Sequence, residues 1–550
     1  MASTMYGQTP EDVPGTILIW DSHNSPDGIQ HANDGHIVLQ PQPSEDPEDP
    51  LNWAKSRKTR SIIMSYIYTF GIGIATTVTY SILTQIADAQ GLTIANLNTG
   101  TGIMQIMQGW GCLLWQPIAM TYGRRGVYIV TIALSTIPVL WTPFSNGASQ
   151  WYAHRILLGI FCCPVESLPE VSVPDVYFAH ERGRYIALYA FILFGSNFLA
   201  PFLAGFIADQ EGWKPVMYFA TAVMATCTII LFFGLEETMF FRKTTEGTAP
   251  AAIPAKEIDE QHVDNKNTAE DQRRGSLANT TRTTSIHHRP ARSYIQKLQL
   301  WTFLPGRPTR KQMFLKSWRS LKIIVLFPNI LWVGLLFGTN IGWYSVMNAT
   351  MSLILSADPY NFSPRMIGVA YLSPLVGGGV ACVWAGKVSD MLVLYLAKRN
   401  KGIREPEQRL WGLALSAIMS TCGLLMWGVG ASQSAHYMVL IIGIGVMTFG
   451  VVSACAISLA YSVDCFKEIH GESFVSIMVI RNTIGFCFSY AITPWIESVG
   501  LRNCFISVSI ISFVCTNSFL LMVFFGKSLR RACAERYWRY VAAEKDTAIY

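Results

Sequence analysis

Long apolar stretches separated by short polar loops fill the chain between residues 62 and 526. A helix needs about 20 predominantly apolar residues to cross the hydrocarbon core of a bilayer. By this criterion the pattern predicts twelve spans in two sets of six, and therefore an all-α polytopic membrane protein with two six-helix bundles. The predicted spans are residues 62–87, 98–120, 127–145, 151–175, 185–208, 215–235, 322–354, 365–392, 409–430, 436–463, 474–497 and 502–526.

Polar segments precede, separate and follow the two sets of spans. Residues 1–60 contain the run PQPSEDPEDP, and residues 237–320 are rich in Ser and Thr and mostly lack hydrophobic periodicity. We expect both segments to be largely disordered, as an N-terminal tail and a linker. The bundles then comprise residues 61–236 and 321–526, and residues 527–550 form a short C-terminal tail. No cleavable signal peptide opens the chain, so the first span is expected to act as its own insertion signal.

Basic residues mark one side of the predicted membrane layout. Lys and Arg concentrate in the short cytoplasmic loops of polytopic membrane proteins. The rule predicts that both termini and the linker are cytoplasmic. The short loops and the tail on the basic side contain Arg124, Arg125, Arg182, Arg184, Lys398, Arg399, Lys401, Arg404, Lys467, Lys527, Arg530 and Arg531, whereas the other side contains Lys214, Arg365 and Arg502.

Composition supports a membrane protein and disfavours other classes. Hydrophobic residues make up 51% of the chain and charged residues 14%, whereas soluble domains carry about 25% charged residues. The net charge of +6 comes from basic residues between the spans, which favours membrane orientation over nucleic-acid binding. The 12 cysteines lie mostly in apolar stretches, without a Cys-x-x-Cys pair, which favours small buried side chains over redox or metal sites. We expect no metal and no cofactor.

The predicted fourth span contains two carboxylates in the run CCPVESLPEV. Steps of 100° per residue place Glu166 and Glu170 on one helical face, which Pro164 and Pro169 are expected to distort. Ionisable residues inside a membrane cost about 2.5–3.5 kcal/mol each and usually mark function. Glu166 lies near mid-depth, so we predict that it exchanges protons and attracts cations, together with Glu170. The alternative is permanent pairing of Glu166 with a basic residue of another helix; Arg155, on the same face, is about 16 Å away along the axis.

Other spans carry polar and aromatic residues that suit the lining of a ligand cavity. In span eleven, Arg481 lies some two turns inside the predicted bilayer and needs an internal partner, either a glutamate or backbone carbonyls. Asn482 follows it in the chain. Ordinary packing explains each of the other candidates individually, and only their grouping indicates a cavity. They are Tyr66, Thr77 and Tyr80 in span one and Asn340, Trp343 and Tyr344 in span seven.

Several motifs resemble those of the major facilitator superfamily, and in detail its fungal branch of twelve-span drug:proton antiporters. PQPSEDPEDPLNWAKSRK resembles the pre-membrane signature of that branch, and YGRRGVYI resembles the loop motif after span two. HRILLGIFCCPVESLPEVSVPDVYFAHERG resembles the span-four block, and GSNFLAPFLAGFIADQEGW resembles the span-five antiporter motif. The resemblance implies the major facilitator fold. It also implies gating roles for Gly123, Arg124, Arg125, Pro201, Gly205, Gly386 and Asp390.

The chain departs from these motifs at several positions. The loop motif usually has an acid three residues before its glycine, where this chain has Met120, and an arginine where this chain has Thr121. The sequence therefore lacks residues of one charge-based latch of the outward-facing state. The second half retains the corresponding pattern in residues 386–390, Gly-Lys-Val-Ser-Asp, as an internal repeat would. In span five, Ala200 and Ala204 replace motif glycines and still allow close helix packing.

The resemblance implies alternating access, in which two bundles rock around a central site lined chiefly by spans one, four, seven and ten. We expect a proton-coupled secondary active transporter that exports small hydrophobic or cationic compounds, with protons and the small-molecule substrate as its partners. Uptake of polyamines or other organic cations is the alternative, because two stacked acids suit a multiply charged cation.

The sequence disfavours two other classes of membrane protein. A membrane-embedded enzyme is disfavoured because the histidines lie singly rather than in catalytic or metal-binding clusters. A non-transporting sensor is disfavoured because the C-terminal tail is short. We expect a monomer embedded in the lipid bilayer of the plasma membrane, with the vacuolar membrane as the alternative.

Overall fold

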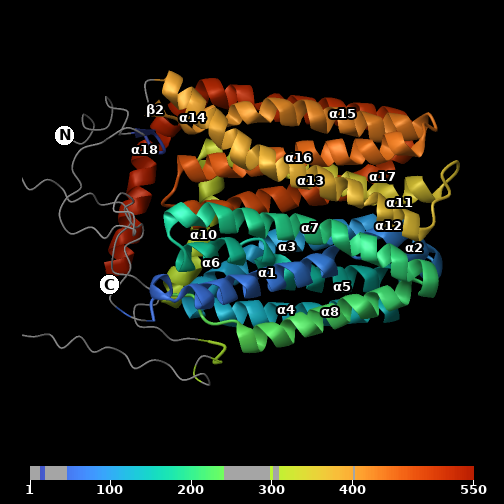
Figure 1. Cartoon of the computed structure of the whole chain (residues 1–550), viewed down its shortest axis with the longest axis horizontal. Coiled ribbons are helices and arrows are strands. Elements are labelled where there is room, and N and C mark those ends of the chain that lie inside the picture. Colours follow the sequence, from blue (N-terminus) through green and yellow to red (C-terminus); the bar gives the residue numbers. More distant parts are fainter. Residues whose placement is uncertain are drawn as a thin grey trace, which may run out of the picture.

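The computed structural model describes residues 13–18, 46, 48–240, 296, 298–301, 309–400 and 403–549 of the chain. Long helices lie side by side along the longest axis of the molecule, and the last part of helix α18 (Phe519–Ile549) lies at one end of this bundle (Figure 1). We call this end the linker face, because helix α10 (Arg310–Leu326), which precedes the second bundle, also lies there. The end that carries α2 (Leu83–Gln90) and α12 (Pro364–Ala370) is called the opposite face.

The first bundle follows the predicted order of six spans. Its apolar helices pack around a shared core that includes Tyr68, Ile132 and Trp151. Two of its spans are interrupted by short 3-10 turns, Tyr80–Ile82 and Cys163–Val165. The helices are α1 (Lys55–Thr77), α2 (Leu83–Gln90), α3 (Ile94–Tyr122), α4 (Arg124–Trp141), α5 (Gly147–Cys162), α6 (Leu168–Val176), α7 (Ala179–Glu211) and α8 (Trp213–Gly234).

The second bundle repeats this arrangement with its own interruptions. A π-helical turn at Trp384–Val388 joins α13 to α14, and a 3-10 turn at Pro406–Gly412 precedes α15. The helices are α11 (Pro328–Ser356), α12 (Pro364–Ala370), α13 (Leu372–Val383), α14 (Ser389–Arg399), α15 (Leu413–Ser432), α16 (Tyr437–Cys465), α17 (His470–Asn517) and α18 (Phe519–Ile549).

Within the described residues, 10 helical stretches are long and apolar enough to cross a membrane. They differ from the twelve predicted spans in two respects. The stretch His470–Val541 contains both of the last two predicted spans, and the backbone breaks between them at Gly500, where φ is 80°. Helix α3 is as long as its neighbours but is not among the apolar stretches, because it carries several amide side chains, among them Gln105, Gln108 and Gln116.

The two bundles meet mainly through α3 and α7 of the first bundle. Helix α3 packs on α17, and α7 packs on α12 and α13. On the opposite face α7 approaches α12 closely: a Cβ atom on Gly205 would lie 2.3 Å from the Pro364 carbonyl oxygen. On the same face, Asn98 of α3 donates to the Thr493 hydroxyl of α17 at 3.1 Å. The bundles are therefore closed against each other on the opposite face.

Two segments outside the predicted bundles are ordered at the linker face. Helix α10 (Arg310–Leu326) begins with a capping box at Thr309, so the predicted linker boundary at residue 320 falls inside a helix. The predicted C-terminal tail continues α18 as a helix to Ile549. In Figure 1 this part of α18 runs across the linker face, transverse to the spanning helices. Most of the predicted linker, residues 237–320, lies outside the described residues.

The first described segment of the chain joins the second bundle rather than the first. Strand β1 (Ile17–Leu18) pairs antiparallel with β2 (Ile403–Arg404). The Arg530 side chain of α18 is fully buried and donates to the Pro14 carbonyl and, at 3.3 Å, to the Thr16 hydroxyl. This N-terminal arm, residues 13–18, is therefore held on the linker face of the second bundle.

Candidate functional site

The predicted proline distortion of span four is confirmed, and it positions Glu166. Helix α5 ends at Cys162, a 3-10 turn covers Cys163–Val165, and α6 begins at Leu168, so Glu166 lies in the break. A proline nitrogen cannot donate a hydrogen bond, so the helical ladder is interrupted there. The Tyr189 hydroxyl of α7 donates to the Val165 carbonyl at 2.8 Å and lies 3.1 Å from the Glu166 carbonyl. The break is thus fixed by the neighbouring helix.

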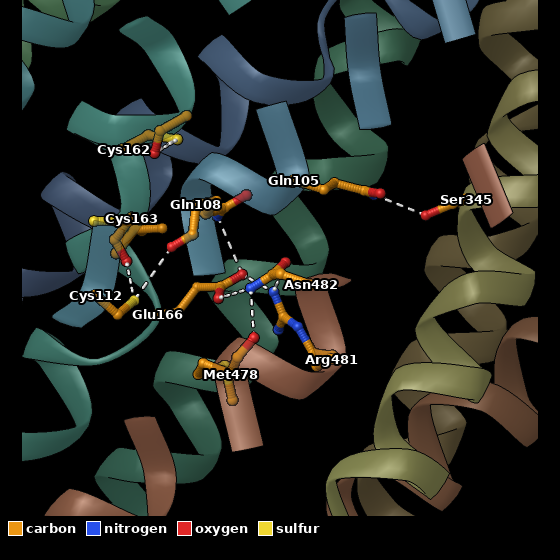
Figure 2. Close-up of polar contacts among 12 residues, drawn as sticks. Gln105, Gln108, Cys112, Cys162, Cys163, Glu166, Ser345, Met478, Arg481 and Asn482 are labelled. Atoms are coloured by element: carbon orange, nitrogen blue, oxygen red, sulfur yellow. Dashed lines mark hydrogen bonds and ion pairs between the residues drawn. The ribbon is translucent and has the colours of Figure 1, made fainter. Parts of the chain in front are cut away.

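Glu166 is an ion-pair partner of Arg481 across the interface between the bundles. The guanidinium of Arg481, on α17, donates to Glu166 Oε1, and Asn482 Nδ2 lies 3.3 Å from Glu166 Oε2. From the first bundle, Gln108 Nε2 of α3 donates to Oε1 at 3.1 Å. Figure 2 shows the carboxylate pointing at Arg481 and Asn482, with Gln108 on its other side. Of the two partners predicted for Arg481, the glutamate is the one found.

Burial makes this cluster electrostatically strong. Glu166 is 7% exposed and Arg481 is 9% exposed. Opposite charges removed from water interact strongly, and removal of either one leaves a costly buried charge. The Arg481 guanidinium also lies 5.4 Å from the centre of the Phe337 ring on α11. Arg481 Nη2 donates to Asn482 Oδ1 at 3.0 Å. The ion pair therefore joins α3, the α5–α6 break and α17 at one point.

The other two residues grouped with Glu166 lie apart from it. Glu170 is 8% exposed, and its Oε1 is 3.9 Å from His470 Nε2 at the start of α17. Arg155 is 2% exposed and points to a different place: its Nη2 donates to Thr79 at 3.0 Å, and its guanidinium lies 4.5 Å from the Trp151 ring centre. Glu170 thus faces the second bundle as Glu166 does, whereas Arg155 is held within the first.

The predicted polar face of α11 carries buried polar atoms that the described residues leave without hydrogen-bond partners. These atoms are Asn340 Oδ1 and Trp343 Nε1. Tyr344 and Asn348, one turn apart on the same helix, interact with each other. Trp343 is fully buried against Phe488 of α17, with ring centres 4.6 Å apart. Buried polar groups normally have partners, so an unmet acceptor and an unmet donor on one helix suit a surface that a ligand or water completes.

Two of the three candidates in span one, Tyr66 and Thr77, form hydrogen bonds within their own bundle. The Tyr66 hydroxyl donates to the Tyr185 carbonyl of α7 at 2.9 Å, and the Thr77 hydroxyl donates to the Gly73 carbonyl one turn back at 2.8 Å. Tyr80 is 5% exposed and lies in the 3-10 turn that follows α1. These contacts match the packing interpretation of Tyr66 and Thr77.

The loop motif after α3 ties together the linker-face ends of the first bundle. Gly123 has φ 110°, and a Cβ atom there would lie 2.4 Å from Glu237 Oε2. The Glu237 carboxylate accepts from the backbone nitrogens of Arg124 at 2.9 Å and Arg125 at 3.1 Å, at the N-terminus of α4. Such a carboxylate satisfies free amides and complements the helix dipole. The Arg124 side chain pairs with Asp175, at the end of span four.

The second bundle has a related set of charges. Arg409, just before α15, pairs with Asp390 at 3.0 Å and with Asp464, at the end of α16, at 3.1 Å. Arg409 and Asp464 thus stand where Arg124 and Asp175 stand in the first bundle, as an internal repeat predicts. Gly386 lies in the π-helical turn of the same motif, and a Cβ atom there would meet nothing within 4 Å.

The span-five motif supplies the contact on the opposite face. A Cβ atom on Gly368 of α12 would lie 3.2 Å from the Pro201 carbonyl oxygen and 3.2 Å from Gly205 Cα. Ala200 and Ala204 are fully buried in the same part of α7. Small residues therefore let the two backbones approach closely, as predicted.

The sequence does not indicate two sets of residues that the structure shows in buried polar contacts. Gln108 holds Glu166 from α3, and its only signal was an amide inside a predicted span. Glu407 and Arg530 form a buried pair with distances of 2.8 and 2.6 Å, although Arg530 was predicted as part of a tail. Within the described residues, no group of three or more His, Cys, Asp or Glu side chains could hold a metal ion.

Two bundles of spanning helices that enclose a buried charged cluster define an integral membrane protein of the transporter class. The sequence profile of the Major Facilitator Superfamily matches residues 65–464, and the chain belongs to that family. An uncharacterized MFS-type transporter of Schizosaccharomyces pombe is 30% identical to this chain, and the match covers 96% of this chain and 95% of that protein. Protein HOL1 of Saccharomyces cerevisiae is 26% identical to this chain, and the match covers 95% of this chain and 96% of HOL1.

A solved structure confirms the fold. The xylose transporter XylE from E. coli, in a partially occluded inward-open conformation, superposes with a TM-score of 0.54. The sequences are 11% identical, and the match covers 84% of this chain and 97% of the other. The predicted major facilitator fold is therefore confirmed, and the two relatives above confirm the predicted link to fungal members of the family.

Proposed function

We propose that this chain is a proton-coupled secondary active transporter that exports small hydrophobic or cationic compounds by alternating access. The observation that supports the proposal is the buried ion pair between Glu166 and Arg481, because it joins the two bundles that must move against each other. A carboxylate with one partner in each bundle is sensitive both to protonation and to the relative position of the bundles.

Three positive groups compete for Glu166 in this proposal: Arg481, a proton and a cationic substrate. Protonation neutralises Glu166, removes its attraction for Arg481 and frees the bundles to separate at this point. A cationic substrate takes the place of Arg481 at the deprotonated carboxylate. Because proton and substrate bind the same group in exclusive states, each shifts the conformational population that the other favours, which is sufficient for coupling.

The α11 face completes the proposed substrate path. Asn340 and Trp343 each present a buried polar atom that the described residues leave unmet, and Tyr344 lies beside them on the same helix. Ligand sites commonly combine aromatic walls with a few such groups. We place the substrate between this face and the Glu166 cluster, with Arg481 and Asn482 at the border.

Uptake of polyamines or other organic cations is the second candidate, and Glu170 favours it. Glu170 lies one turn from Glu166 toward the linker face and is also buried. Two carboxylates along one path suit a cation with separated charges. We keep export as the first candidate because of the motif resemblance to drug:proton antiporters. We also propose that the linker face is cytoplasmic, and that a monomer acts in the plasma membrane or, alternatively, the vacuolar membrane.

The test uses purified full-length protein in liposomes with an imposed pH gradient and a panel of hydrophobic cations and polyamines. Substrate-triggered proton flux in the wild type is expected to vanish in Glu166→Gln and to return partly in Glu166→Asp. Glu497→Gln, at an exposed carboxylate on α17, is the matched control. The direction of proton flux relative to substrate separates antiport from symport.

Folding must be separated from coupling in this experiment. Each variant is first compared with the wild type by size-exclusion profile and thermal unfolding, and only folded protein is reconstituted. If folded Glu166→Gln retains substrate-triggered proton flux, Glu166 is a structural charge and the coupling role is overturned.

A further inference from the structure

Helix α10 is fixed to both bundles through its inner face. The Ser317 hydroxyl donates to the Leu113 carbonyl of α3 at 2.9 Å, and the Ser476 hydroxyl of α17 donates to the Ser320 carbonyl at 2.6 Å. Ser320 and Ile323 are buried in this contact. Because these two contacts fix the rotation of α10 about its own axis, the outer face of the helix points away from both bundles.

The outer face of α10 is a stripe of large apolar side chains. At 100° per residue the stripe occupies an arc of about 100°, which also includes two lysines. Single exposed apolar residues are ordinary, but a continuous stripe along one helix indicates contact with another apolar phase. The apolar members are Phe314, Leu315, Trp318 and Val325, at 65%, 46%, 55% and 81% exposure, and the lysines are Lys311 and Lys322.

The charges of α10 have one sign. The helix sequence RKQMFLKSWRSLKIIVL contains five basic residues and no acidic one. Lys322 Nζ lies over the Trp318 ring, 5.9 Å from its centre, so a basic group and an aromatic side chain are adjacent on this face. A helix with an apolar stripe and basic flanks fits the boundary between lipid headgroups and acyl chains.

The position of α10 in the chain places it at that boundary. Helix α10 ends at Leu326, Phe327 caps it, and Pro328 begins α11, which is one of the membrane-crossing stretches. With only one residue between the two helices, the end of α10 lies level with the start of a span. Its tryptophan is of the type that concentrates at membrane interfaces.

We propose that the outer face of α10 binds the anionic phospholipids of the adjacent leaflet. The apolar stripe enters the acyl-chain region, and Lys311 and Lys322 contact the lipid phosphate and carboxylate groups. A water-soluble protein partner would need a matching acidic groove, whereas the bilayer is already present at this height. Because α10 is bonded to α3 and to α17, lipid bound here also holds both bundles at the linker face.

The test follows Trp318 fluorescence in the full-length protein in mixed micelles that contain a small fraction of brominated lipid. The Trp318 signal is the difference between each protein and its own Trp318→Phe partner. Brominated phosphatidylserine is expected to reach half-maximal quenching at a mole fraction about 25-fold lower than brominated phosphatidylcholine, since each of the two lysines near an anionic surface contributes roughly fivefold. This preference is expected to disappear in Lys311→Gln/Lys322→Gln.

The control pair is Lys398→Gln/Arg399→Gln, which removes two exposed basic residues from the end of α14. It is expected to retain the wild-type preference for phosphatidylserine. If neither brominated lipid quenches Trp318, the stripe is covered by protein, for example a second copy of the chain, and the proposal is overturned. Equal quenching by the two lipids, or a loss of preference in the control pair as well, overturns the recognition of charge by α10.

Discussion

Glu166 and Arg481 are 315 residues apart in the chain and form a buried ion pair across the interface between the two bundles. Every change in the relative position of the bundles at this height acts on that pair. The same contact therefore contributes both to the stability of one conformation and, in our proposal, to the coupling of proton and substrate.

The first prediction concerns the free energy of this pair. Arg481→Gln leaves a buried carboxylate without its charge partner and is expected to lower the free energy of unfolding by about 3–5 kcal/mol. The double variant Glu166→Gln/Arg481→Gln removes both charges and is expected to recover most of that loss. Thermal unfolding in detergent of the wild type, both single variants and the double variant measures the coupling. Additive effects of the two substitutions would contradict a direct pair.

The second prediction concerns Gly123. With φ at 110° and the Glu237 carboxylate 2.4 Å from the place of a Cβ atom, Gly123→Ala meets both backbone strain and a clash. We expect a loss of about 1–3 kcal/mol in unfolding free energy. Gly212 has φ 82° and open space around it, so Gly212→Ala isolates the backbone contribution. The prediction fails if the two variants melt at the same temperature.

The third prediction concerns closure of the opposite face. Gly205→Ala places a methyl group against the Pro364 carbonyl and is expected to push α7 and α12 apart. Spin labels at Asp209→Cys and Met366→Cys, in a background without the exposed Cys422 and Cys487, measure the separation. We expect a longer mean distance in Gly205→Ala.

Gly379→Ala is the matched control for Gly205→Ala, because a Cβ atom on Gly379 of α13 would meet nothing within 4 Å. It is expected to keep the wild-type distance distribution. An unchanged distribution in Gly205→Ala would show that the bundles accommodate the methyl group without opening.

The fourth prediction concerns the buried pair between Arg530 and Glu407. Arg530→Met is expected to lower the free energy of unfolding by about 3–5 kcal/mol, because Glu407 is left buried without its partner. Arg539→Met removes an exposed pair with Glu535 on the same helix and is expected to cost under about 0.5 kcal/mol. Chemical unfolding of the two variants makes the comparison, and equal losses would contradict it.

The positions of the spans and the break near Glu166 could be predicted because they depend on local properties. Apolar length sets the spans, and Pro164 interrupts a helix wherever that helix packs. The partner of Arg481 could be narrowed to a glutamate or backbone carbonyls, because a buried guanidinium needs an acceptor. The choice between these depended on which helices face each other, which a single sequence does not specify.

The grouping of Arg155 with the glutamates shows the same limit. The spacing along one continuous helix predicts that Arg155 shares a face with Glu166. The 3-10 turn after Cys162 interrupts that helix before Glu166, so the spacing no longer applies. Arg155 instead meets Thr79 and Trp151 within the first bundle. Gln108 was missed for a related reason, since an amide inside a span is common and its role depends on a neighbour 58 residues away.

The N-terminal arm precedes the first bundle in the chain yet is bound to the second. Gly15 packs against the backbone of Asp464 and Cys465, and β1 adds a strand to β2. A fluorophore attached next to Val13 would therefore report the movements of the second bundle, and a distance measured from it to α4 would follow the rocking of one bundle against the other.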